Sequence, residues 1–248
     1  MGLKLLLGSS GMIGRNLKEL LPPMLYPTHA ELDLTDRIKV KEYLDYHKPE
    51  QIVHCASKDD EICLYDNLRM FHNLAESHIP MITFCTGLEI ENRPNKSGEY
   101  VLSKYIIKEL ALNRYNHITV LKIWGCFGKY EKPIRFFTDN MLRIKQGLPI
   151  LVREDKIFSY VYVKDLAKII NDIINDLEIE NKLYNIVGYT QSLLSYAGLL
   201  KRITGSPHDI IVEKTNFYNS YIGQNDFEFN YTPLPIALKE VWDVMARD

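Results

Sequence analysis

The sequence has little cysteine and no paired cysteine motif. Its 248 residues include four cysteines, and no two of them form a C-x-x-C pair. The four are Cys55, Cys63, Cys85 and Cys126. Cysteines spaced in this way are not typical of a disulfide framework or of a zinc site. We therefore predict that the protein holds neither disulfides nor a metal ion.

Long hydrophobic runs are also missing. The longest apolar runs, such as Leu5–Leu7, are far shorter than the roughly 20 residues that a membrane-spanning helix needs. A polar, glycine-rich turn at residues 8–14 interrupts the N-terminal apolar stretch, which is not typical of a signal peptide. These features predict a cytoplasmic protein that has no membrane partner.

Neither sign of charge dominates. Thirty Lys and Arg residues stand against 32 Asp and Glu residues, which gives a formal net charge of −2. Without a basic field, binding to nucleic acid or to an anionic membrane is not expected. The length and the 46% hydrophobic content are sufficient for one large domain, or for a domain with an appended lobe.

The first half of the chain alternates apolar runs with helical patterns. Strands are predicted at Leu3–Leu7, Met24–Tyr26, Gln51–Ala56, Met81–Cys85 and Ile118–Trp124. Helices are predicted at Met12–Leu21, 36–47, Asn67–Ser77 and Tyr100–Arg114. This alternation is typical of β-α-β units. It predicts an α/β fold with a doubly wound, Rossmann-like parallel sheet.

In the second half of the chain, predicted strands and helices alternate less regularly. Strands are predicted at Ile157–Val163 and Leu183–Val187, and helices at Leu166–Leu177, Leu193–Ile203 and Leu234–Met245. We expect a dinucleotide-binding domain of residues 1–124 plus about 157–187. Residues of about 125–156 plus 188–248 are then expected to form a small C-terminal α/β substrate lobe.

A glycine-rich turn joins the first predicted strand to the first helix. Gly8, Gly11 and Gly14 form a G-x-x-G-x-x-G pattern. Backbone amides at a helix N-terminus bind pyrophosphate, and the missing Cβ atoms let it approach the main chain. We therefore expect Gly8, Ser10, Gly11, Met12, Ile13 and Gly14 to bind a dinucleotide. A tight strand-to-helix connection without a ligand is the alternative.

A tyrosine and a lysine have the spacing of an acid-base pair. Y-x-x-x-K occurs at Tyr100 and Lys104 and again at Tyr160 and Lys164, but only the first pair lies in a predicted helix, where i and i+4 share a face. A phenol with a pKa of about 10 needs roughly 4 kcal/mol to exchange a proton near neutral pH. An ammonium about 4 Å away supplies a stabilisation on the order of 4 kcal/mol.

Further segments resemble the short-chain dehydrogenase/reductase superfamily, in particular its extended, NAD-dependent epimerase/dehydratase branch. Residues 54–57 resemble H-x-A-A, residues 67–74 resemble N-V-x-G-T-x-N-L, and residues 183–188 resemble Y-N-I-G. Within this branch, the sequence resembles the GDP-fucose synthases and the dTDP-4-dehydrorhamnose reductases. The resemblance implies cofactor contacts from Asp33, Leu34, Cys55, Ala56, Ser57 and Lys104. It also implies a catalytic set of Thr86, Tyr100 and Lys104.

Departures from the family pattern narrow the expected reaction. Gly87 and Leu88 follow Thr86, where the 4,6-dehydratases of the family have an Asp-Glu pair for dehydration. GDP-fucose synthases use a cysteine and a later histidine for epimerisation. Here Leu88 replaces the cysteine, and no histidine occurs between His117 and His208. We therefore expect NADP(H)-dependent reduction of a nucleotide-linked keto sugar. A 4-epimerase that retains NAD and a non-catalytic NAD(P)-binding protein are the alternatives.

Two further features of the sequence concern the cofactor and the oligomeric state. No carboxylate occurs at Tyr26–His29, where one would bind a ribose 2′-hydroxyl, so NADP(H) is favoured, with Ser9, Ser10 or His29 as donors to its 2′-phosphate. Glu31 keeps NAD(H) open. Many members of the family dimerise through the helix that carries the Tyr-Lys pair, and we therefore expect a homodimer.

Overall fold

The computed structural model describes residues 2–60, 62–89, 98–175, 182–226 and 228–247. The chain divides into two units. The first comprises residues 1–123 and 167–185, and the second comprises residues 124–166 and 186–248.

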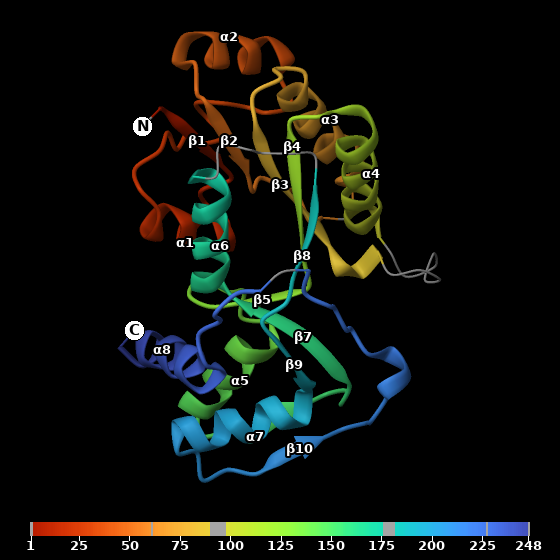
Figure 1. Cartoon of the computed structure of the whole chain (residues 1–248). Helices are drawn as coiled ribbons and strands as arrows, with labels where there is room; N and C mark the ends of the chain where they lie inside the picture. Colours follow the sequence, from red (N-terminus) through yellow and green to blue (C-terminus); the bar gives the residue numbers. More distant parts are fainter. Residues whose placement is uncertain (1, 61, 90–97, 176–181, 227, 248) are drawn as a thin grey trace. The chain divides into compact units, whose positions relative to one another are not determined.

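The first unit is built on a five-stranded sheet in the order β1-β2-β3-β4-β8, in which β1 to β4 are parallel (Figure 1). The strands are β1 (Lys4–Leu7), β2 (Gln51–His54), β3 (Met81–Thr86), β4 (Ile118–Ile123) and β8 (Leu183–Ile186). The helices are α1 (Met12–Leu20), α2 (Arg37–His47), α3 (Leu64–Ala75), a 3-10 turn (Gly87–Glu89), α4 (Glu99–Arg114) and most of α6 (Val163–Asn175). The predicted α/β fold with a parallel, Rossmann-like sheet is confirmed.

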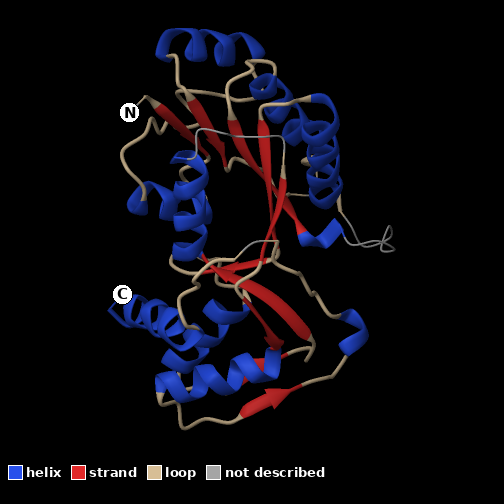
Figure 2. Cartoon of the chain, in the orientation of Figure 1, coloured by secondary structure: helices blue, strands red, loops and turns tan. Residues whose placement is uncertain are grey.

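Helices cover both faces of this sheet, with α1 and α6 on one side and α3 and α4 on the other (Figures 1 and 2). All six residues of β3 are buried, as expected for a parallel strand that is covered on both faces. Leu5 and Ile52 belong to one buried cluster with Phe71 of α3 and Ile107 of α4. This packing fixes the strand ends, from which the loops of the candidate site emerge.

The predicted strand Met24–Tyr26 is reduced to a single parallel bridge between Leu25 and Leu5. Two backbone hydrogen bonds support the bridge, from Leu6 N to Leu25 O at 2.9 Å and from Leu25 N to Lys4 O at 2.8 Å. Prolines flank the segment at positions 22, 23 and 27. Because proline has no N–H to donate, it limits strand pairing. The predicted short strand is therefore present only as this one bridged residue.

The second unit contains a three-stranded sheet, β5-β7-β9, and a parallel pair, β6-β10. The strands are β5 (Gly125–Phe127), β6 (Ile150–Val152), β7 (Ile157–Tyr162), β9 (Tyr189–Ser192) and β10 (Ile210–Val212). The helices are α5 (Phe136–Lys145), α7 (Leu193–Thr204) and α8 (Leu234–Arg247), with a 3-10 turn at Phe217–Asn219. Residues 157–166 belong to this unit because β7 pairs with β5 and β9, whereas the sequence placed them in the first domain.

Aromatic rings form the core of the second unit. Phe127 and Phe137 have ring centroids 4.8 Å apart, and Tyr160 lies 4.9 Å from Phe137. The buried carboxylate of Asp165 accepts hydrogen bonds from Thr232 N at 2.9 Å and Thr232 Oγ1 at 2.7 Å. No described helix of either unit is long and apolar enough to cross a membrane.

Candidate active site

The strand connections of the first unit reverse direction around β1. On one side Leu5 bridges Leu25, and on the other side Leu5 is in register with Ile52 of β2. In open α/β sheets, ligands bind outside the carboxyl ends of the strands at such a reversal. The loops that follow β1, Leu25 and β2 meet there.

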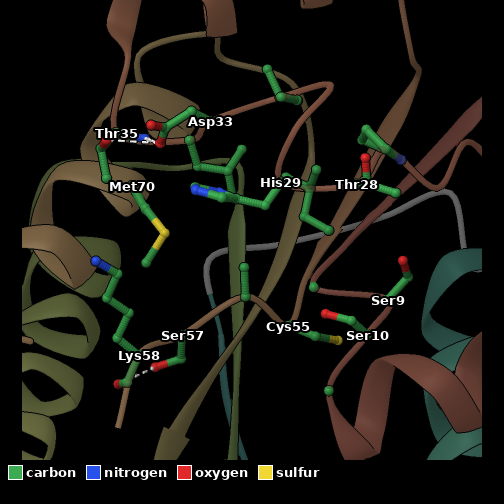
Figure 3. Close-up of a pocket in the computed structure, with 17 residues that line it drawn as sticks. Ser9, Ser10, Thr28, His29, Asp33, Thr35, Cys55, Ser57, Lys58 and Met70 are labelled. Atoms are coloured by element: carbon green, nitrogen blue, oxygen red, sulfur yellow. Dashed lines mark hydrogen bonds between the residues drawn. The ribbon is translucent and has the colours of Figure 1, made fainter. Parts of the chain in front are cut away.

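These three loops enclose a pocket with a volume of about 470 Å³ (Figure 3). It includes eight of the residues that the sequence assigned to the cofactor, namely Gly8, Ser10, Gly11, Asp33, Leu34, Cys55, Ala56 and Ser57. Ser9 and His29, which the sequence suggested as donors to a 2′-phosphate, also line it. Residues that the sequence did not assign complete it: Leu7, Pro27, Thr28, Leu32, Thr35, Lys58 and Met70. The predicted contacts Met12, Ile13, Gly14 and Lys104 are not part of its lining.

The three glycines of the turn have different structural roles. Gly8 has φ +78°, and a Cβ there would lie 2.4 Å from Ala56 N. A Cβ on Gly14 would lie 2.1 Å from Gly8 O. At Gly11 the nearest atom would be Gly8 O at 3.5 Å, which is ordinary contact. Packing therefore requires glycine at positions 8 and 14, whereas Gly11 leaves space on the pocket side.

The start of α1 suits a bound pyrophosphate. Gly11 is the N-cap residue of α1 and has no side chain to accept from the first amides of the helix. Met12 and Ile13 form the first turn, where backbone N–H groups lack partners within the helix. These donors and the open surface at Gly11 fit an anionic diphosphate. Met12 and Ile13 would then contribute through their amides, and Gly14 through helix packing.

Asparagine and threonine side chains hold the loop at Asp33 and Leu34 in place. The Asp33 carboxylate accepts from Thr35 Oγ1 at 2.8 Å and from Thr35 N at 2.9 Å. These bonds lower the pKa of Asp33, so the pocket wall carries an ionised acid. Asn73 Nδ2 of α3 donates to Leu34 O at 2.9 Å. Asn73 was not predicted as a site residue, although the family-like segment 67–74 includes it.

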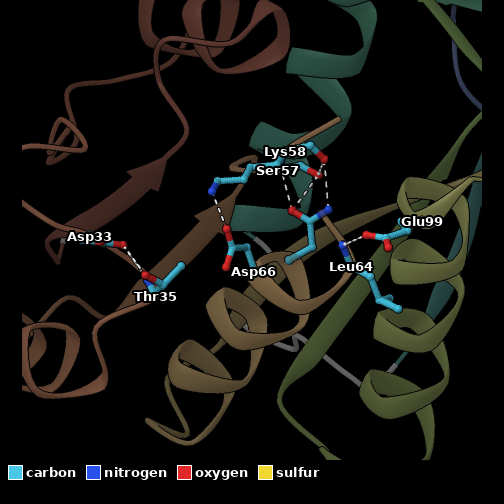
Figure 4. A network of polar contacts seen from close by, with 8 residues as sticks. Asp33, Thr35, Ser57, Lys58, Leu64, Asp66 and Glu99 are labelled. Carbon is cyan, nitrogen blue, oxygen red and sulfur yellow. Dashed lines mark hydrogen bonds and ion pairs between the residues drawn. The ribbon is translucent and has the colours of Figure 1, made fainter. Parts of the chain in front are cut away.

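Asn67 joins the pocket to the helix that carries Tyr100. Figure 4 shows contacts in this region, among them those of Lys58 with Asp66 and of Leu64 with Glu99. Its Oδ1 accepts from Lys58 N at 2.8 Å, and its Nδ2 donates to Lys58 O at 3.0 Å and to Ser103 Oγ at 3.1 Å. Ser103 Oγ in turn donates to Tyr100 O at 2.7 Å. The Lys58 ammonium also pairs with Asp66 of α3. One buried amide thus connects the loop after β2 to the start of α4.

Replacing Asn67 with alanine is expected to lower the free energy of unfolding by about 2 to 3 kcal/mol, because it removes three hydrogen bonds at about 1 kcal/mol each, two to the backbone of Lys58 and one to the hydroxyl of Ser103. Urea unfolding measures this change. Ser103→Ala is the matched control, since it removes the Ser103 end of the network and keeps both bonds to Lys58. Equal losses in the two variants would contradict a role for Asn67 in holding the loop.

The three predicted catalytic residues lie at the carboxyl edge of the same sheet. Thr86 is the last residue of β3, is buried, and accepts from Leu88 N at 3.2 Å. Helix α4 packs against β3 and against the 3-10 turn that follows Thr86. Tyr100 lies in the first turn of α4, and Lys104 Nζ lies 5.8 Å from the centre of its ring. Glu99 fixes the start of the helix by accepting from Leu64 N at 2.9 Å.

The Lys104 ammonium is buried near the ends of β2 and β3. Its side chain is 6% exposed. Burial lowers its pKa to about 8, and the nearby thiols of Cys85, Cys55 and Cys63 oppose this shift. Burial, with a smaller contribution from Lys104, lowers the pKa of His54 to about 3. At neutral pH the site therefore contains a charged lysine beside a neutral histidine.

The other Y-x-x-x-K pair does not form a comparable arrangement. Tyr160 is buried in strand β7, whereas Lys164 in α6 pairs with Glu240 at 2.6 Å. In the same unit, Arg153 pairs with Asp139 at 2.9 Å, and Lys156 pairs with Glu154 at 3.0 Å.

Glu131 is a buried acid that the sequence did not single out. Thr138 Oγ1 donates to its carboxyl at 2.7 Å. Burial raises the pKa of Glu131 from its ordinary value of 4.5 to about 7. A carboxyl with a raised folded-state pKa binds more protons in the folded protein than in the unfolded chain. The contribution of Glu131 to the free energy of unfolding is therefore fully present below pH 4.5 and is lost as the pH rises through 7.

We expect the difference in unfolding free energy between the Glu131→Gln variant and the wild type to shift by about 2 kcal/mol in favour of the variant from pH 5 to pH 8. The reason is that glutamine carries no buried charge at either pH, whereas Glu131 becomes charged. Chemical unfolding at the two pH values measures the difference. A stability difference that is the same at both pH values would show that Glu131 does not titrate in this range.

Among the described residues, no group of three or more His, Cys, Asp or Glu side chains could hold a metal ion. The four cysteines are free thiols. Within the described ranges, the residues grouped at the sheet edge are glycines, small polar residues and a tyrosine-lysine pair, arranged on a Rossmann-like fold.

The fold is shared with enzymes that modify nucleotide sugars. A GDP-L-fucose synthetase from Naegleria fowleri bound to NADP superimposes with a TM-score of 0.82 at 15% identity, over 99% of this chain and 93% of that one. A dTDP-4-dehydrorhamnose reductase from Bacillus anthracis in complex with NADP gives 0.82 at 17% identity, over 98% of each chain. At these identities the likeness shows the fold, in agreement with the family resemblance of the motifs.

One curated relative matches part of the chain. A dTDP-4-keto-6-deoxy-D-glucose reductase from Streptomyces niveus is 42% identical over 57 residues, which is 21% of this chain and 20% of that protein. No protein-family model matches the sequence.

Proposed function

We propose that this protein is an NADP(H)-dependent reductase of a nucleotide-linked keto sugar. One observation carries the proposal: the glycine turn, Thr86 and the Tyr100–Lys104 pair all lie at the carboxyl edge of one parallel sheet. The named activities of the curated relative and of the dehydrorhamnose reductase neighbour support a keto-sugar reduction. A cytoplasmic location and a homodimer stay predictions from the sequence.

The pocket residues have separate tasks in this function. Amides at the start of α1 and the open surface at Gly11 bind the pyrophosphate, and the loops at Asp33 and at Cys55–Ser57 enclose the adenosine end. Bound NADPH would supply a hydride to the carbonyl carbon of the sugar.

Tyr100, Thr86 and Lys104 act on the carbonyl oxygen. The Thr86 hydroxyl orients the oxygen, and the Tyr100 phenol donates the proton that completes the secondary alcohol. The resulting phenolate is stabilised by the neighbouring Lys104 ammonium, and a proton from solvent restores the phenol. Because the pKa of Lys104 is about 8, this ammonium is present at neutral pH.

Turnover of a panel of nucleotide-linked 4-keto sugars tests the function. The purified chain is mixed with NADPH and dTDP-linked or GDP-linked 4-keto-6-deoxyhexoses. We expect loss of absorbance at 340 nm in proportion to a product two mass units heavier than the ketone. The same reactions with NADH measure the cofactor preference.

Two results would contradict the proposal. Dinucleotide binding without turnover across the panel would make the chain a binding protein. Interconversion of 4-epimers without added cofactor, with dinucleotide copurifying, would make it an epimerase.

A further inference from the structure

One end of the pocket lies at the position where Rossmann-like proteins distinguish NAD from NADP. The discriminating residue follows the strand next to β1, about 20 residues after the glycine turn. Here that strand is the Leu25 bridge, and Thr28 and His29 follow it and line the pocket. Glu31 lies in the same turn but is not among the lining residues.

Thr28 holds the Glu31 carboxylate through two hydrogen bonds. Glu31 Oε2 accepts from Thr28 N at 2.7 Å and from Thr28 Oγ1 at 2.9 Å. In return, Glu31 N donates to Thr28 O at 3.1 Å, which closes the turn. The bonds from Thr28 N and from Thr28 Oγ1 to the carboxylate lower the pKa of Glu31, so the carboxylate is ionised at neutral pH and its charge is directed at Thr28.

Other charged or polar groups also line the pocket. The Asp33 carboxylate is bonded to Thr35. The Lys58 ammonium pairs with Asp66, and the His29 imidazole extends from the wall toward the side of the pocket where Asp33 lies (Figure 3). A carboxylate at position 31 that turned into the pocket would repel a 2′-phosphate and would instead accept from a 2′-hydroxyl.

We propose that Thr28 sets the nucleotide preference of the pocket by holding the Glu31 carboxylate outside it, so that the end at Thr28 and His29 takes a 2′-phosphate. This inference rests on the proposed dinucleotide binding. It assigns the preference to a hydrogen bond between two residues of one turn, and not to a basic residue that contacts the phosphate.

Calorimetric titration of NADP⁺ and NAD⁺ into four proteins tests the inference. The proteins are the wild type, Thr28→Val, Glu31→Gln and the double variant. Thr28→Val removes the hydroxyl donor and is expected to lower NADP⁺ affinity by about fivefold at low salt, without lowering that for NAD⁺. The loss should shrink at 0.5 M salt, because salt screens the repulsion between exposed charges.

The remaining variants show whether the charge of Glu31 is responsible for the loss of NADP⁺ affinity in Thr28→Val. Glu31→Gln alone is expected to change either affinity by less than about twofold. The double variant is expected to regain the wild-type NADP⁺ affinity, and Thr28→Ser, which keeps the hydroxyl, to retain it. Circular dichroism confirms that each variant is folded.

Two outcomes would overturn the inference. One is a Thr28→Val loss that persists in the double variant, which would mean that the hydroxyl contacts the nucleotide directly. The other is a fall in NAD⁺ affinity of Glu31→Gln, which would place the carboxylate on the ribose. If the wild type binds neither nucleotide, the proposed function itself fails.

Discussion

The Tyr100→Phe variant is expected to reduce a nucleotide-linked keto sugar at least about 100-fold more slowly than the wild type, while its dinucleotide affinity changes by less than about threefold. The phenol is the proposed proton donor, and removing a positioned general acid typically lowers a rate by about 10² to 10⁴. Phenylalanine keeps the ring beside Lys104, whose Nζ lies 5.8 Å from its centre. The measurements are NADPH oxidation under saturating substrate and calorimetric binding.

Tyr160→Phe is the matched control for this prediction. Tyr160 belongs to the second Y-x-x-x-K sequence but is buried in strand β7, where its ring packs against Phe137 at 4.9 Å. Removing the Tyr160 hydroxyl is therefore expected to change the rate of keto-sugar reduction by less than about threefold. A Tyr100→Phe protein that turns over at the wild-type rate would remove the phenol from the mechanism.

The Gly14→Ala variant is expected to lose about 3 kcal/mol or more of unfolding free energy. Its new Cβ would lie 2.1 Å from Gly8 O and 2.9 Å from Ser9 Cα. Both neighbours belong to the backbone, so α1 has to move away from the turn, and overpacking of this kind destabilises by a few kcal/mol. Urea unfolding measures the loss.

Gly11→Ala is the matched control, because it should affect stability less than Gly14→Ala and should mainly affect nucleotide affinity. Its Cβ would meet no atom closer than 3.5 Å, so we expect a loss of only about 1 kcal/mol of unfolding free energy, which arises because alanine is a poorer N-cap residue than glycine. Because Gly11 lines the pocket, we expect its NADP⁺ affinity to fall at least tenfold. Undiminished affinity in Gly11→Ala would show that the nucleotide does not approach the turn.

The sequence predicted the first unit better than the second. Strands such as Ile118–Ile123 and helices such as Arg37–His47, which Asp36 caps through Ile38 N and Lys39 N, have clear apolar patterns and boundaries. The strands β5, β6 and β10 contain three residues each, too few for any periodicity. Helix α5 also was not predicted. It follows the exposed Ile134 and lacks a side-chain cap at Arg135.

Those parts of the candidate site whose chemistry depends on short sequence patterns could be predicted. The glycine turn and the Tyr100–Lys104 spacing are short patterns with a direct physical meaning. The roles of Asn67 and Thr28 depend on which partners the fold brings to them. Asn67 bonds to Lys58 and to Ser103, nine and 36 residues away in the sequence. No spacing rule identifies such contacts, although the family-like segment 67–74 marks the region.

The bridge at Leu25 has a consequence for the motion of the pocket. The wall formed by residues 27–35 follows a segment that joins β1 through two backbone hydrogen bonds, whereas the wall at residues 55–58 follows β2, which pairs with β1 and β3. Short edge pairings open at a lower free energy than central strands. Nucleotide entry is therefore expected to proceed by outward movement of the 27–35 wall, and bound nucleotide should slow amide hydrogen exchange there more than in β2.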